Sequence, residues 1–154
     1  MSDNITVEIS IPCDDEGYVL FKCSHCGELF KITASDAKDD EVLDIYCPAC
    51  GLTSESYLTD DVISLANAKI NNLVNDMIYD TSKKMERHNK RNSPLQFKAG
   101  KKPKHEYESP LHSTIEALEE TEFLCCNRSA KINPLLKMSA CYCPFCGVIK
   151  FGDE

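Results

Sequence analysis

Three segments of this chain share the pattern Cys-x-x-Cys-Gly, at residues 23–27, 47–51 and 143–147. Such a turn directs two sulfurs at one metal ion, and its glycine takes the left-handed backbone conformation that points amide N–H groups at those sulfurs. The first two segments follow each other at hairpin separation, which predicts a tetrahedral site of Cys23, Cys26, Cys47 and Cys50. His25 could replace one cysteine as a ligand, and buried free thiols or disulfides are the weaker alternative.

Short strands are predicted around this site. Ile5 to Ile11 alternate apolar and polar residues, and Gly17–Phe21, Leu29–Ile32 and Val42–Tyr46 flank the cysteine turns. The polar loop 35–41 has the composition of a single helical turn. Residues 1–58 therefore read as a β-ribbon with two hairpins around one metal. A unit of this size buries too little apolar surface to fold without its metal.

A long helix is predicted over residues 59–91. Thr59 is placed as an N-cap, with two aspartates in the first turn, and no glycine or proline follows until Pro94. Apolar residues recur at helical spacing, and this stripe predicts a packing face for the chain's own ribbons or for a second copy in a homodimer. The stripe consists of Ala66, Ile70, Leu73 and Met77, broadened by Ile63, Val74 and Ile78.

The end of this helix and the linker at 92–112 are basic, although the whole chain has a formal net charge of −8. Prolines and a glycine predict an extended linker. The positive charge could bind DNA or RNA, or an acidic protein surface; the alternative is a solvated charge run with an internal acidic complement. The candidate nucleic-acid-binding residues are Lys83, Lys84, Arg87, Lys90, Arg91, Lys101, Lys102 and Lys104.

The C-terminal segment, residues 113–154, repeats the first ribbon imperfectly. A capping box at 113–116 predicts a short helix that ends before Phe123. Tyr-Cys-Pro-x-Cys-Gly at 142–147 matches 46–51, but adjacent cysteines stand where the first Cys-x-x-Cys turn is expected. Five thiols therefore compete for four ligand positions: Cys125, Cys126, Cys141, Cys143 and Cys146. Cys141 could equally be a buried small apolar residue, and a fifth thiol could also be redox-active or bind a cluster.

Phe-Lys-Cys-Ser-His-Cys-Gly at 21–27 and Tyr-Cys-Pro-Ala-Cys-Gly at 46–51 resemble the zinc ribbons of general transcription factors and the related rubredoxin-like knuckles. The C-terminal segment resembles the same class with a defective first knuckle. The resemblance implies a zinc-stabilised module that contacts nucleic acid, polymerase or partner proteins, and it implies no reaction. The expected fold is α+β, with two small zinc β-ribbons joined by a long helix and a basic linker.

Function is expected to be non-catalytic. The four histidines share no spacing, and the chain has no nucleophile motif, no zinc-deaminase pattern and no glycine-rich phosphate loop. We expect two zinc ions and an adaptor or accessory subunit of a larger protein or nucleoprotein complex; the alternative is a rubredoxin-like iron electron carrier. The N-terminal residues do not resemble a signal peptide and no apolar run is long enough for a membrane span, so reduced cysteines in a cytoplasmic protein are expected.

Overall fold

The computed structural model describes residues 4–89, 94, 96–112 and 117–152. The chain forms two compact units, one from residues 1–9 and 61–110 and one from residues 10–60 and 111–154. The second unit, here called the ribbon body, contains every segment with paired cysteines. The fold class is α+β, as the sequence predicts, with one long helix and small antiparallel sheets that carry two ribbon-like cysteine groups.

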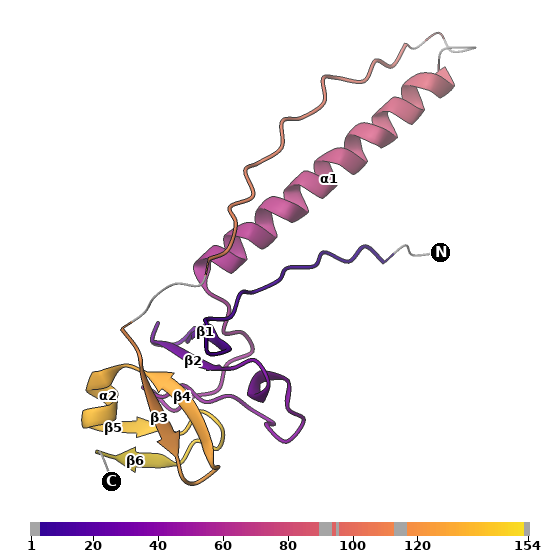
Figure 1. Cartoon of the computed structure of the whole chain (residues 1–154). Helices are drawn as coiled ribbons and strands as arrows, with labels where there is room; N and C mark the ends of the chain where they lie inside the picture. Colours follow the sequence, from indigo (N-terminus) through magenta and orange to yellow (C-terminus); the bar gives the residue numbers. More distant parts are fainter. Residues whose placement is uncertain (1–3, 90–93, 95, 113–116, 153–154) are drawn as a thin grey trace. The chain divides into compact units, whose positions relative to one another are not determined.

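The ribbon body is centred on a four-stranded antiparallel sheet of order β1-β2-β4-β3 (Figure 1). One hairpin joins β1 (Tyr18–Lys22) to β2 (Leu29–Thr33), and the other joins β3 (Glu119–Phe123) to β4 (Arg128–Ile132). The inner strands β2 and β4 pair with Lys31 opposite Lys131 and Ile32 opposite Ala130. Residues 10–60 and 111–154, here called the N-terminal and C-terminal halves, thus contribute one hairpin each to a shared sheet.

A second, smaller sheet pairs β5 (Ala140–Tyr142) with β6 (Ile149–Phe151) around the last cysteine turn. The N-terminal half has a shortened version of it, because Tyr46 and Thr53 form an isolated bridge around residues 47–51. The predicted strand at Val42–Tyr46 is therefore wrong beyond this single bridge. The polar loop does contain the expected helical turn, a 3-10 helix at Asp36–Lys38.

Two further predictions are wrong, and one short helix was not predicted. The residues before Phe123 form strand β3 instead of a helix, because Thr121 and Phe123 alternate inward against β4; the capping box itself lies outside the described residues. Ile5–Ile11 forms no strand, and its end residues are exposed. A short helix, α2 (Pro134–Met138), was not predicted, although Asn133 caps it by accepting a hydrogen bond from the Leu135 N–H and Pro134 occupies the first turn.

The core of the ribbon body draws on both halves. Phe30 and Ile32 from β2 pack with Phe123, Ala130 and Ile132 from β3 and β4. Tyr57 makes edge-on contacts with the rings of Phe21 and Phe30, and its hydroxyl donates to the carbonyl of Ile45. Because both hairpins contribute residues to this one core, burial of these residues joins the two halves.

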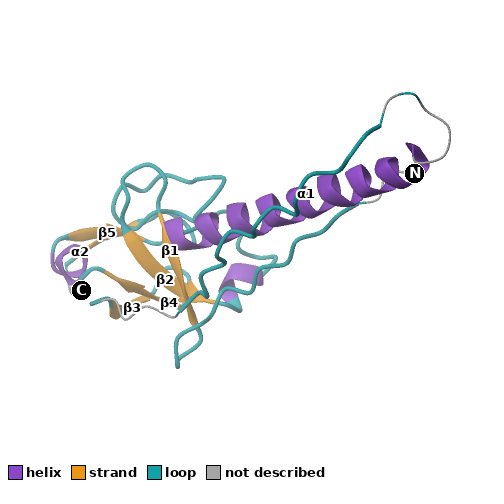
Figure 2. Ribbon diagram, turned by 90° about the horizontal axis from the view of Figure 1, so that it is seen from above, coloured by secondary structure: helices purple, strands orange, loops and turns teal. Residues whose placement is uncertain are grey.

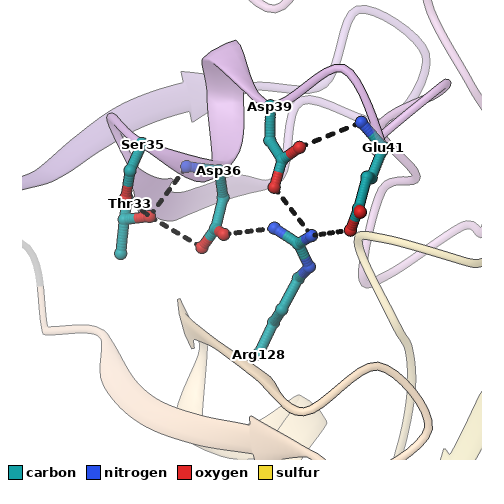
Figure 3. Close-up of polar contacts among 6 residues, drawn as sticks. All are labelled: Thr33, Ser35, Asp36, Asp39, Glu41 and Arg128. Atoms are coloured by element: carbon teal, nitrogen blue, oxygen red, sulfur yellow. Dashed lines mark hydrogen bonds and ion pairs between the residues drawn. The ribbon is translucent and has the colours of Figure 1, made fainter.

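Polar contacts reinforce this junction at two places. Arg128 on β4 reaches the loop of the other half, where its guanidinium lies 2.5 Å from Asp36, 2.8 Å from Asp39 and 3.5 Å from Glu41 (Figure 3). The facing ammonium groups of Lys31 and Lys131 repel each other. The carboxylate of Asp14 lies 3.4 Å from the first and 3.0 Å from the second, which offsets that repulsion.

The other unit contains α1 (Asp60–Asn89) and an extended segment, residues 96–110, that runs beside it (Figures 1 and 2). The long helix is confirmed, and it begins directly after the predicted cap. Among the described residues, none of the helices combines the length and the apolar character that crossing a membrane requires. Residues 96–112 have no regular secondary structure, in agreement with the predicted extended linker.

Candidate metal centres

The four cysteines of the N-terminal half converge in one group. The sulfurs of Cys23, Cys26, Cys47 and Cys50 all lie within 4.8 Å of one another. The Sγ atoms of Cys23 and Cys50 are 3.8 Å apart, and those of Cys26 and Cys47 are 3.5 Å apart. Tetrahedral zinc–thiolate geometry, with zinc–sulfur bonds of about 2.3 Å, places sulfurs about 3.8 Å apart. The donor set and its spacing therefore fit one tetrahedral metal ion.

The C-terminal half contains a second group of four thiols, Cys125, Cys126, Cys143 and Cys146, again with sulfurs within 4.8 Å of one another. The Sγ atoms of Cys125 and Cys146 are 3.5 Å apart. Adjacent cysteines can both join this group because residues 124–127 form a turn, whereas an extended strand would point them to opposite faces. This half also fits one tetrahedral ion.

Cys141 lies outside that group and belongs to the hydrophobic core, with 1% of its surface exposed. Burial raises the pKa of its thiol, so the neutral form is favoured and the side chain packs as a small apolar residue. Cys13 is exposed and is also separate from both groups. Of the five C-terminal cysteines that the sequence left in competition, the structure brings four together.

The thiols within each group differ in their pKa. Burial raises the pKa of Cys47 and of Cys143, the two most enclosed sulfurs. Burial also acts to raise the pKa of Cys23, but hydrogen bonds from the backbone N–H groups of Cys26 and His25 outweigh it and lower the pKa to about 7. The buried thiols must lose protons when a metal binds, so metal affinity falls as the pH is lowered.

Strand pairing reveals how the two first turns correspond. Lys31 pairs with Leu20 and Lys131 with Glu120, so the hairpins align with a constant offset of 100 residues. This register places Cys126 at the position of Cys26. Phe123 takes the buried position of Cys23, and Cys125 stands where the other half has His25. One ligand has moved two residues along the chain, into the turn.

Backbone conformation supports that alignment. Gly27 follows Cys26 with φ of +78°, and Asn127 follows Cys126 with φ of +51°. Asn127 is the one non-glycine residue with positive φ in the described chain, and asparagine tolerates this conformation better than most residues. Both turns therefore reverse in the same way although their sequences differ.

His25 does not join the thiol group. Its Nε2 atom lies 3.1 Å from the carbonyl oxygen of Thr53, within hydrogen-bond distance. Neighbouring hydroxyls of Ser24 and Ser54 lie 2.5 Å apart. These contacts tie the first cysteine turn to the segment that follows the second turn, and they give the histidine a structural role in place of the ligand role considered above.

The two metal centres are joined through reciprocal tyrosine contacts. The N–H of Tyr46 donates to the carbonyl of Pro144 at 2.8 Å, and the N–H of Tyr142 donates to the carbonyl of Pro48 at 2.9 Å. Each tyrosine ring also covers the glycine of the opposite cysteine turn: a Cβ at Gly51 would lie 2.7 Å from the Tyr142 ring, and one at Gly147 would lie 2.9 Å from the Tyr46 ring. Each half therefore braces the metal turn of the other.

The basic residues predicted to bind nucleic acid lie in the unit that contains α1. Lys83 forms an ion pair with Glu86, and Lys102 with Asp76, at 3.2 Å each. Part of the positive charge thus has an internal acidic complement. Lys84, Arg87, Lys101 and Lys104 are exposed, whereas Lys90 and Arg91 lie outside the described residues.

Comparison with protein-family models, curated proteins and solved structures found no match.

Proposed function

We propose that the protein is a non-catalytic zinc-binding accessory protein that contacts a larger protein or nucleoprotein assembly. The observation that supports it most is the pair of four-thiol groups built into a single core. With four thiolates on each ion, no position is left open for a water or a substrate, which distinguishes structural zinc sites from catalytic ones. The metal would therefore stabilise a rigid surface that bears the contacts.

Metal content tests this proposal directly. Protein purified without added metal should contain two zinc ions per chain and be colourless. Tetrahedral thiolate also accepts iron, so stoichiometric iron with a red chromophore would replace the proposal with the electron-carrier alternative. Cadmium or cobalt substitution would add a count of thiolate ligands through charge-transfer absorption, expected at four per site.

The exposed basic residues at the end of α1 and in the extended segment are the proposed contact for a polyanion. Lys101 and Lys104 project from the extended segment, and Lys84 and Arg87 from the end of α1. Phosphate contacts of this kind make affinity fall linearly on a log–log plot against salt, with a slope of about 0.9 for each neutralised phosphate of duplex DNA.

The matching experiment measures binding of duplex DNA and single-stranded RNA across a salt series. Neutralising Lys101 and Lys104 together should weaken binding and flatten the salt slope by about 2 for duplex DNA. Lys137→Gln, on α2 in the ribbon body, serves as the control for loss of one positive charge elsewhere. Unchanged binding in the double variant, or no binding at low salt, would leave contact with a protein as the only use of this basic surface.

A further inference from the structure

Helix α1 has one face that its own chain already occupies. Val62, Leu65, Ala68 and Asn72 are its buried residues. The side-chain oxygen of Asn72 accepts from the N–H of Glu106 at 2.7 Å, and its amide donates to the Glu106 carbonyl at 3.0 Å. Farther along, Asp76 lies 2.9 Å from His105. The extended segment is therefore fastened to this face through polar contacts.

The predicted apolar stripe lies mainly on the other side of the helix. Five of its large apolar residues are exposed by 43–59% of their surface: Ile63, Ile70, Val74, Met77 and Ile78. Met85, farther along the same side, is exposed by 52%, whereas Leu73 is partly buried. Exposed apolar side chains in a continuous row along a helix mark an interaction surface. The sequence predicted this stripe as a packing face, but the residues that α1 buries within the chain are a different set.

The centre of the stripe follows the spacing 4-3-4-4-3-4, which keeps it nearly straight along an α-helix. The seven positions are Ile63, Asn67, Ile70, Val74, Ile78, Thr81 and Met85. Read outward from Val74, the stripe has the same character in both directions: Ile70 matches Ile78, Asn67 matches Thr81, and Ile63 matches Met85. Such a face can pack against the same face of a second helix that runs in the opposite direction, because apolar residues then meet apolar residues and polar residues meet polar residues.

We propose that α1 associates with the α1 of a second copy in an antiparallel, two-fold symmetric pair, with the axis passing beside Val74. An isologous interface of this kind requires a surface that is complementary to itself. In this register Val74 meets its own equivalent, and Ile70 meets Ile78 of the second copy. Asn67 meets Thr81, and this polar pair within an apolar seam fixes the register.

The charges at the helix ends favour the same direction. The first turn begins with Asp60 and Asp61, and the last turn carries Arg87 and His88. Antiparallel packing places the acidic start of each helix at the level of the basic end of the other, and it also opposes the two helix dipoles. A parallel pair would instead set like ends beside each other.

The first experiment uses the zinc-loaded full chain in sedimentation equilibrium across a range of concentrations. The wild type should form a dimer, and Val74→Asp should raise its dissociation constant at least 100-fold, because the change places two carboxylates at the axis. Ser64→Asp introduces the same charge on an exposed part of α1 outside the stripe and should leave dimerisation unchanged. A wild type that is monomeric throughout, or a Val74→Asp dimer of unchanged affinity, would overturn the proposal.

A second experiment tests direction and register. Asn67→Lys or Thr81→Glu alone should weaken the dimer, whereas both changes in one chain should restore it, because each lysine then faces a glutamate of the other copy. In a parallel pair the double variant would place lysine against lysine and glutamate against glutamate. A double variant that is weaker than either single one would therefore reject the antiparallel arrangement. Circular dichroism at the same concentrations confirms that each variant keeps its helix.

Discussion

The two halves of the ribbon body use the same second cysteine turn and different first turns. Tyr-Cys-Pro-x-Cys-Gly occurs in both, and Cys47 and Cys143 are equally buried. In the first turn, however, the N-terminal half has the buried thiol of Cys23, while the C-terminal half has Phe123 at that position and the exposed thiol of Cys125. Two of the four cysteines are buried in the N-terminal centre and one of the four in the C-terminal centre, and each centre has one exposed cysteine, Cys26 or Cys125.

This comparison shows that a four-thiol site tolerates relocation of one ligand when the turn around it is conserved. Gly27 and Asn127 both have positive φ, and the strand register on either side is unchanged. The relocation leaves the metal less shielded, since a metal with fewer buried ligands is more accessible to water and to competing ligands. The ribbon body thus offers an internal comparison of a more enclosed and a less enclosed metal centre.

The largest expected effect comes from removing equivalent buried ligands. Cys47→Ala and Cys143→Ala should each abolish one metal site, where apparent zinc-binding free energies in small zinc peptides are about 10–16 kcal/mol. Because the halves share a sheet and a core, each change should also lower the melting temperature of the half that keeps its metal. Zinc content and thermal unfolding followed by NMR test this. An unaltered second half would show that the halves are independent.

The reciprocal tyrosine contacts predict the next effect. Gly51→Ala and Gly147→Ala add a methyl group against a tyrosine ring and also strain a left-handed backbone. We expect each to reduce the free energy of unfolding by about 2–5 kcal/mol, from backbone strain of about 1–2 kcal/mol and overpacking of about 1–3 kcal/mol.

Gly27→Ala supplies the control for this pair. Gly27 has a similar φ of +78°, but an added Cβ there meets nothing within 4 Å. Its cost should therefore be confined to the backbone strain of about 1–2 kcal/mol. Equal destabilisation at all three glycines in denaturant unfolding would remove the evidence for mutual bracing.

Asp14, in the N-terminal half, stabilises the junction through its contact with Lys131 of the C-terminal half. Burial acts to raise its pKa, but hydrogen bonds from the N–H of Tyr18, from Lys131 and from the N–H of Glu16 lower it to about 2. A carboxyl group with a lowered pKa stabilises the fold at pH values above its unfolded pKa of about 4. This stabilisation is lost as the pH falls towards 2. Asp14→Asn should therefore destabilise the protein by about 2 kcal/mol.

The pH dependence provides the check on that prediction. The difference between the wild type and Asp14→Asn in urea unfolding should stay constant from pH 5.5 to pH 8, because the carboxyl is ionised in both states over that range. Equal stability of the wild type and Asp14→Asn at pH 7 would mean that the asparagine amide keeps the hydrogen bonds and that the charge contributes little.

The smallest expected effect concerns metal release. A chelator should remove zinc from the C-terminal centre about tenfold faster than from the N-terminal centre, a difference of about 1.4 kcal/mol in activation free energy. The double change Phe123→Cys and Cys125→His gives the C-terminal turn the ligand placement of the other half and should slow release there. Release at one common rate in the wild type would contradict the distinction between the more enclosed and the less enclosed centre.

Local signals in the sequence predicted much of this structure. The short apolar segments on either side of the first cysteine turn identified β1 and β2, and an uninterrupted helical pattern identified α1, whereas the apolar and polar alternation at Ile5–Ile11 forms no strand. Glu119–Phe123 was misread because the capping box before it favours a helix, and only pairing with β4 shows which of its residues point inward. For α2 a signal was present, since asparagine before proline is typical of a helix start, although five residues give too little periodicity to support it.

The placement of the candidate site depended on contacts between distant residues. The repeated Tyr-Cys-Pro-x-Cys-Gly identified both second turns, but it could not show that the tyrosines exchange partners between the halves. Cys141 was ambiguous because its spacing from Cys143 suits a ligand, and the core around it decides otherwise. Similarly, Asn72 is buried through polar contacts with Glu106, which apolar periodicity cannot reveal.

The ribbon body is assembled from two segments that are separated by residues 61–110. Each segment supplies one hairpin and one cysteine group, and the contacts between them do not depend on a covalent link. A chain cleaved in the extended segment should consequently behave as a two-fragment complex whose melting temperature rises with concentration, because joining the segments becomes a bimolecular reaction. The intact linker acts as a tether that supplies an effective concentration in the millimolar range or below.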